Sequence, residues 1–140
     1  MMPAFEIVKK AWDEREQFHE SKQILFFEKM CPWKEHLFSI EEELEMPAEI
    51  KFVMFVDGRG MWRINTVPPH ASSFDMRVPL CKEWRGLRKE EISKIEGNPL
   101  QDIEFVHNTG FCGGAWSKVT AIKMALTSIQ QHAEFTKKND

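Results

Sequence analysis

The sequence predicts an α+β domain, an α/β sandwich in which helices cover a mixed sheet of about four strands. Segments with apolar residues at every third or fourth position alternate along the chain with short β-branched or aromatic runs. The chain has 140 residues, 42% of them hydrophobic and 29% charged, which is typical of one globular core. The expected element order is α-β-α-β-β-α-β-α.

The first part of the chain predicts two helices with a strand between them. Apolar residues at helical spacing indicate a helix from about Pro3 to Glu20, and the run Gln23–Glu28 is β-prone and too short for a helix. A second helix is expected to open with Pro32 in its first turn and to end at Pro47. Its apolar face would consist of Trp33, Leu37, Ile40 and Leu44.

A β-hairpin is expected next. The β-prone runs Ile50–Val56 and Met61–Val67 flank Asp57–Gly60, whose glycines permit the positive φ angles of a tight turn. Two prolines at 68–69 then stop the second strand, and an irregular stretch is expected to reach about Leu87.

The last part of the chain predicts helix, strand and helix. A short helix over Lys89–Glu96 would end at Gly97, and Asn98–Pro99 would turn the chain into a strand over Ile103–His107. Ser117 is a suitable N-cap for the final helix. The inward face of this helix would consist of Val119, Ile122, Leu126 and Ile129.

Composition and charge exclude several classes of protein. No apolar run approaches the ~20 residues that cross a bilayer, so no membrane contact is expected. Cys31, Cys81 and Cys112 are an odd number without close spacing, which indicates neither a disulfide framework nor a zinc site and favours a reducing, intracellular compartment. The net charge is −3, with an acidic excess in residues 1–50, so nucleic acid could bind only at a local basic patch in the later part.

The segment from His107 to Ser117 is the first candidate site. A strand end, a glycine-containing loop and a helix N-terminus would present backbone N–H groups to a phosphate or carboxylate. The alternative is a bulged strand end that needs its glycines for packing, with His107 bonded to a backbone carbonyl. A thiol nucleophile built from Cys112 and His107 is a weaker hypothesis, because no third group orients the pair.

The long irregular stretch carries the second candidate site. Arg77, Arg85 and Arg88 offer planar donors to phosphate oxygens, and Trp84 offers a surface on which a base could stack. The alternative is structural: Trp84 would anchor the loop in the core, and the arginines would be paired with carboxylates.

Several strings together resemble the C-terminal part of the Myg-one exonucleases, which are often described as metal-dependent protein hydrolases and belong to the DHH phosphoesterase superfamily. The resemblance runs from about Gln23 to Ala125. It is carried by CPWKEHLF at 31–38, Trp62-Arg63, Phe74 and Arg77 before Pro79-Leu80, WRGLR at 84–88, Phe105-Val106-His107, Gly110-Phe111 and Gly113-Gly114.

The resemblance implies a longer parent enzyme with two parts. An N-terminal DHH domain would hold manganese, and a C-terminal domain would grip the phosphate or terminal nucleotide of RNA. Residues 1–22 would then be the interdomain segment and residues 23–140 the substrate-binding domain, non-catalytic in isolation, of a 3'-5' RNA exonuclease or phosphodiesterase. The parent would be mitochondrial, nuclear or cytoplasmic.

The two lines of reasoning give one set of candidate residues. Residues that bind substrate or phosphate are expected to be His107, Gly110, Gly113, Gly114, Ser117, Lys118, Arg85, Arg88, Trp84 and Arg77. None is expected to be catalytic or to bind metal. The sequence departs from the family pattern after the glycine pair, where Trp116 stands in place of an expected lysine, although Lys118 keeps one positive charge. The alternative function is a protein-interaction module, such as a homodimerisation domain, that binds no ligand.

Overall fold

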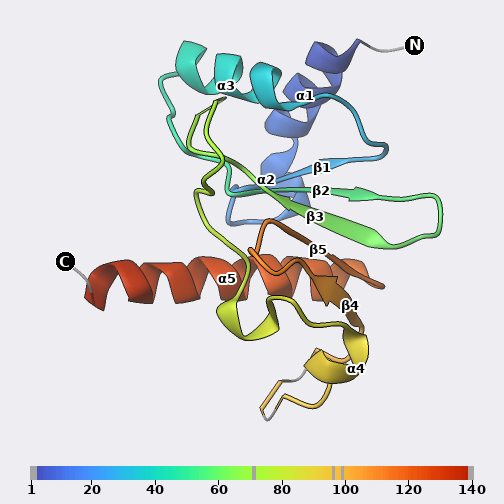
Figure 1. Ribbon diagram of the computed structural model, residues 1–140. Helices are drawn as coiled ribbons and strands as arrows, with labels where there is room; N and C mark the ends of the chain where they lie inside the picture. Colours follow the sequence, from blue (N-terminus) through green and yellow to red (C-terminus); the bar gives the residue numbers. More distant parts are fainter. Residues whose placement is uncertain (1–2, 71, 96, 99, 139–140) are drawn as a thin grey trace.

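In the computed structural model, which describes residues 3–70, 72–95, 97–98 and 100–138, a mixed sheet lies between two groups of helices (Figure 1). The elements are α1 (Ala4–Asp13), α2 (Arg15–Phe18), β1 (Ile24–Phe27), α3 (Lys34–Glu43), β2 (Phe52–Val56), β3 (Trp62–Thr66), the 3₁₀ turn η1 (Lys82–Trp84), α4 (Lys89–Ile92), β4 (Ile103–Val106), β5 (Cys112–Ala115) and α5 (Lys118–Lys138). The predicted α+β class is confirmed.

The sheet has the strand order β1-β2-β3-β5-β4. Strands β1 and β2 are parallel, and the other neighbours are antiparallel. The expected hairpin joins β2 to β3: Asp57 N donates to Met61 O at 2.9 Å, and Gly60 has a φ of 85°. Among the described residues the sheet therefore has one strand more than the four expected, and the additional strand is β5.

Alternation along the strands divides the core in two. On one face, Ile24, Met54 and Ile64 pack with residues of α5 such as Met124. On the other face, the strand residues Leu25, Phe27 and Val53 pack with α1 and α3. The helices contribute Val8, Trp12, Leu37 and Ile40 to this second cluster. In Figure 1, α1 and α3 lie above the sheet and α5 crosses the molecule below it, with α4 further down.

The N-terminal helix is interrupted, which corrects the expected single helix over residues 3–20. The Nη1 group of Arg15 donates to the carbonyl of Trp12 at 2.9 Å. A side chain that takes a backbone carbonyl competes with the i→i−4 ladder, and α1 ends at Asp13. The guanidinium of Arg15 also lies over the Trp12 ring, 4.2 Å from its centroid, so the contact joins α2 to α1.

Helix α3 is shorter at both ends than expected. Trp33 is its N-cap, and Glu45 follows the helix with a φ of 55°. Met46 N donates to Glu41 O at 2.9 Å, a six-residue closure that ends the helix before Pro47. Leu44 is 44% exposed, so it does not belong to the buried face of the helix.

The final helix begins as expected, and Ile122 and Ile129 of its predicted inward face are partly buried against the core. Thr120 N donates to Ser117 Oγ at 3.2 Å, which confirms the predicted cap. Val119, however, is 61% exposed. The buried stripe is Ala121, Met124, Ala125 and Ser128, whose mostly small side chains let the helix lie close to the sheet.

Helix α4 is also shorter than expected, because its i→i−4 ladder stops at Ser93, and the bonds of Lys94 and Ile95 span only three residues. Glu96 and Pro99 lie outside the described residues. No helix in the described ranges is both long and apolar enough to cross a membrane.

Candidate nucleic-acid interface

A tight turn joins β4 to β5 and carries His107 on its surface. Gly110 N donates to His107 O at 2.8 Å, and Gly110 has a φ of 80°, which favours glycine at this position. His107 is exposed, and its Nδ1 lies 2.9 Å from Thr109 Oγ1. The imidazole is therefore oriented by the turn and open to solvent.

The WRGLR segment runs along the outer edge of β4. Gly86 N donates to Val106 O at 2.9 Å, Val106 N donates to Leu87 O at 3.1 Å, and Arg88 forms a bridge with Phe105. This pairing covers the edge strand and brings the basic segment to the end of β4 that carries the His107 turn.

A shallow hollow of about 390 Å³ lies between the segment and the turn. Its lining residues are Gly86, Leu87, Arg88, Phe105, Val106, His107 and Asn108. The structure thus brings Arg88 and His107 to one concavity, as expected for at least one of the two arginines. Their role in binding stays a prediction.

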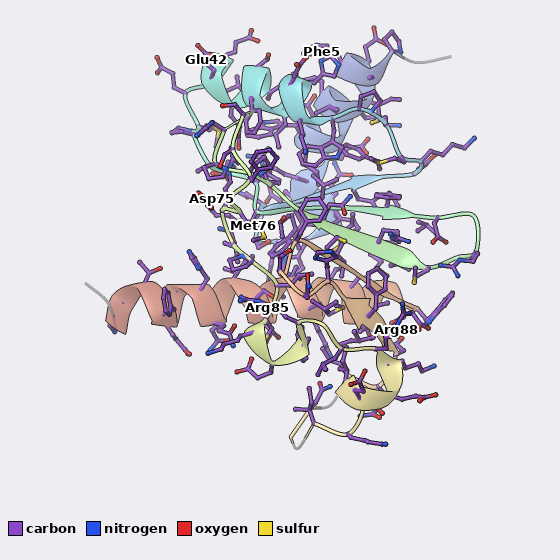
Figure 2. The ribbon with its side chains drawn as sticks, viewed as in Figure 1. Phe5, Glu42, Asp75, Met76, Arg85 and Arg88 are labelled. Atoms are coloured by element: carbon purple, nitrogen blue, oxygen red, sulfur yellow. The ribbon has the colours of Figure 1, made fainter. Side chains whose placement is uncertain are left out.

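Arg85 lies against the same turn at Gly110. Its Nε donates to Leu80 O at 2.8 Å, and a Cβ added to Gly110 would lie 2.8 Å from that Nε. Gly110 is therefore needed both for its backbone angle and for the space that Arg85 occupies. Figure 2 shows Arg85 and Arg88 between η1 and α4, far from Phe5 on α1.

Arg85 and Arg88 differ from the other arginines in their partners. Arg15, Arg59, Arg63 and Arg77 each have a carboxylate oxygen within 4.0 Å. No carboxylate of a described residue lies within that distance of the Arg85 or Arg88 guanidinium. Two guanidinium groups without a carboxylate flank the His107 turn and can receive phosphate oxygens.

The glycine pair forms a strand and not a loop, which corrects the expected path from Gly110 into the last helix. Gly113 and Gly114 pair with β3 on one side and with β4 on the other. A Cβ on Gly113 would lie 2.9 Å from the Phe105 carbonyl oxygen, and one on Gly114 would lie 2.8 Å from Met61 Sδ. Both glycines are therefore explained by the alternative interpretation, in which the strand needs them for packing.

Ser117 and Lys118 lie at the far end of β5 from the turn. The four residues of β5 (Cys112–Ala115), each advancing about 3.3 Å, lie between Gly110 and Ser117, which are therefore at opposite ends of the strand. Lys118 Nζ instead lies 4.9 Å from the Phe18 ring centroid. The structure does not bring this pair to the His107 turn.

Trp84 and Arg77 have the structural roles that the alternative interpretation of this loop predicts. Trp84 is 5% exposed in the core, so its ring offers no face to a base. Arg77 donates to both oxygens of Glu41 at 2.7 Å, and both side chains are buried. This geometry favours anchoring of the loop over contact with a ligand.

The thiols of this region are held protonated. Burial raises the pKa of Cys112 despite the opposing charge of Arg63. Burial and a hydrogen bond that Cys81 Sγ donates to Glu83 raise the pKa of Cys81 to about 12. A thiol nucleophile needs the thiolate, so the Cys112–His107 hypothesis gains no support.

The described residues offer no ligand set for a divalent metal. No three His, Cys, Asp or Glu side chains among them group closely enough to hold a metal ion. The residues present do not fit the manganese that the family resemblance implies for a longer parent enzyme.

Two residues of this surface were not on the list of expected site residues. The guanidinium of Arg63 lies 5.4 Å from the ring centroid of Phe105, two strands away. Both pair in register with Gly114, one from each side. The sequence shows Phe105 in a β-prone run. Its position beside Arg63 depends on β5, and the two glycines of β5 do not predict a strand.

Comparison with known proteins identifies the family. A model of the MYG1 exonuclease family, described as an uncharacterised protein family (UPF0160), matches residues 1–129. The chain belongs to this MYG1 family. The resemblance seen in the short motifs is thereby confirmed.

MYG1 relatives align over nearly the whole chain. The MYG1 protein of Dictyostelium discoideum is 42% identical over 130 residues, covering 93% of this chain and 39% of the relative. The MYG1 exonuclease of Homo sapiens is 40% identical over 133 residues, covering 94% of this chain and 35% of the relative. The chain thus spans under two fifths of the length of these curated relatives. No solved structure matches it.

Proposed function

We propose that this MYG1 chain is the substrate-binding part of a metal-dependent 3'-5' RNA exonuclease or phosphodiesterase and does not cleave nucleic acid by itself. The observation that carries the proposal is the pair Arg85 and Arg88, which flank the exposed His107 turn without a carboxylate partner among the described residues. The name of the human relative, an exonuclease, supports nucleic acid as the ligand.

In this proposal, Arg88 and His107 contact one phosphate in the hollow, and Arg85 contacts a neighbouring one. A charge-assisted hydrogen bond contributes about 1.5–3 kcal/mol, so loss of one contact matters to affinity. Manganese would be held by a DHH domain outside this chain, and that domain would be its partner in the parent enzyme.

The test is the affinity of the chain for a single-stranded oligonucleotide as a function of salt. Arg88→Ala is expected to weaken binding roughly tenfold or more, and to reduce the slope of log affinity against log salt by about 0.7. Lys10→Ala, which removes an exposed cation on α1, is the matched control and is expected to change neither.

Two outcomes would contradict the proposal. If Arg88→Ala and the unsubstituted chain had the same affinity and the same salt dependence, Arg88 would not contact a phosphate. Failure of the chain to bind any oligonucleotide, together with a stable dimer in solution, would favour the interaction-module alternative.

A further inference from the structure

A row of side chains crosses four strands of the sheet beside the hollow. Phe55 on β2 pairs with Arg63 on β3, Arg63 pairs with Gly114 on β5, and Gly114 pairs with Phe105 on β4. Residues directly opposite one another on neighbouring strands share a face of the sheet. The row therefore presents two aromatic rings with a guanidinium between them.

The row is less covered than the rest of its face. Towards β1, the same face is buried under α1 and α3, with Phe27 1% and Val53 0% exposed. Phe55 and Phe105 are half-buried, and the side chain of Arg63 is 33% exposed. The helices thus cover the β1 side of this face, and the β3–β5–β4 side keeps partial access to solvent.

The guanidinium of Arg63 is held over an aromatic ring. It lies 5.4 Å from the Phe105 ring centroid, within the range of a cation–π contact. Its Nη1 is 3.7 Å from Asp57 Oδ2, longer than a charge-assisted hydrogen bond. The other oxygen of Asp57 accepts from Arg59 N and Met61 N, which fixes the carboxylate at the side of the guanidinium.

Phe105 belongs to the row and to the hollow. The hollow that contains Arg88 and His107 is lined in part by Phe105. A ligand phosphate in the hollow would therefore place its attached nucleoside near the Phe105 ring. Aromatic rings and arginine planes are the groups on which unpaired bases stack, whereas a duplex keeps its base faces buried.

We propose that the row of Phe55, Arg63 and Phe105 is a base-stacking surface, so that the chain binds single-stranded nucleic acid in preference to a duplex. This inference rests on the proposed function, because the phosphate in the hollow positions the base.

The test compares three probes: an oligothymidylate, a duplex of the same length, and a deoxyribose-phosphate chain of that length without bases. Phe105→Leu and Arg63→Lys, which keeps the charge and loses the planar fork, are expected to weaken oligothymidylate binding about fivefold or more. Neither is expected to change binding of the chain without bases. Phe5→Leu on α1 is the matched aromatic control.

A second readout follows the base directly. The fluorescence of a 2-aminopurine placed in the oligothymidylate is expected to fall on binding to the unsubstituted chain and to fall less with Arg63→Lys. Urea unfolding of each variant shows whether it is folded, and Arg63→Lys keeps the test available if Phe105→Leu is unstable.

The outcomes separate this inference from the proposed function. If Arg88→Ala weakens binding of all probes while Arg63→Lys and folded Phe105→Leu bind oligothymidylate normally, the phosphate site stands and the stacking surface is wrong. Duplex binding as tight as single-strand binding would also overturn the stacking surface. If Arg88→Ala has no effect, the proposed function itself fails.

Discussion

Gly113 and Gly114 leave space for different neighbours, one a backbone atom and the other a flexible side chain. At Gly113 a Cβ would meet a backbone oxygen, that of Phe105, at 2.9 Å, and Leu80 Cδ1 at 3.2 Å. At Gly114 the first contact would be the thioether sulfur of Met61 at 2.8 Å, on a flexible side chain. Neither glycine has a positive φ, so the requirement is one of space.

Gly113→Ala is therefore expected to destabilise the chain more than Gly114→Ala. The backbone of β4 must move to admit the first methyl group, at a cost of about 1–3 kcal/mol, whereas Met61 can change rotamer to admit the second. The free energies of unfolding in urea give the comparison. Equal losses for the two variants would show that Met61 is as fixed as the backbone.

At the scale of elements, the long loop after β3 is attached to α3 by a buried ion pair. Arg77 donates to Glu41 twice and to the carbonyl of Ile50 at 2.9 Å, and Ile50 N donates to Glu41 Oε2 at 3.2 Å. Arg77 N also donates to Val67 O at 2.8 Å, which closes the base of the loop. Helix α3, the start of β2 and the loop thus share one polar cluster.

Breaking this pair from one side is expected to be costly. Glu41→Gln leaves the Arg77 charge buried without its partner and should lower the free energy of unfolding by about 3–5 kcal/mol, measured in urea. Adding Arg77→Met to this variant should recover part of the loss, since the unpaired charge is removed.

The exposed pair Lys9–Asp13 is the matched control for this experiment. Lys9→Met is expected to change stability by less than about 1 kcal/mol. A loss for Glu41→Gln no larger than that control would mean that water reaches the Arg77 guanidinium.

At the scale of the whole molecule, the chain separates a structural end from a candidate binding end. Helices α1 and α3, with Phe5 and Glu42, lie at one end, and Arg85 and Arg88 lie well away from them, beyond the sheet (Figure 2). The net charge is −3, so binding of a polyanion depends on local guanidinium groups and not on the overall field.

Manganese is expected to leave the chain unchanged. Because the described residues contain no group of three metal-ligating side chains, added Mn²⁺ should not raise the thermal unfolding midpoint, and the chain should not cleave RNA. A ligand at a hundred times its Kd would stabilise the fold by about 2.7 kcal/mol, which a thermal scan detects. A clear rise that chelation reverses would show a metal site and contradict the prediction.

Much of the architecture could be predicted because it depends on local chemistry. The hairpin at Asp57–Gly60, the cap at Ser117 and the short strand β1 each follow from residues within one segment. The family could be identified for the same reason, since strings such as WRGLR are read without knowledge of the fold.

The composition of the site depended on tertiary structure. Strand β5 has two glycines and little β-propensity of its own; it is a strand because β3 and β4 satisfy its backbone groups on both sides. That pairing places Ser117 and Lys118 away from the His107 turn and brings Arg63 beside Phe105.

The sequence by itself determined the fold class, the family, and the presence of a basic segment and of a histidine followed by a glycine-containing turn. Only the tertiary structure decided which arginines are committed to carboxylates and which are not. Arg77 and Arg85 look equivalent along the chain, yet one meets Glu41, 36 residues away, and the other meets the carbonyl of Leu80. The physical reason is that the interaction of two charges depends on the distance between them. Tertiary packing sets that distance, and local sequence does not encode it.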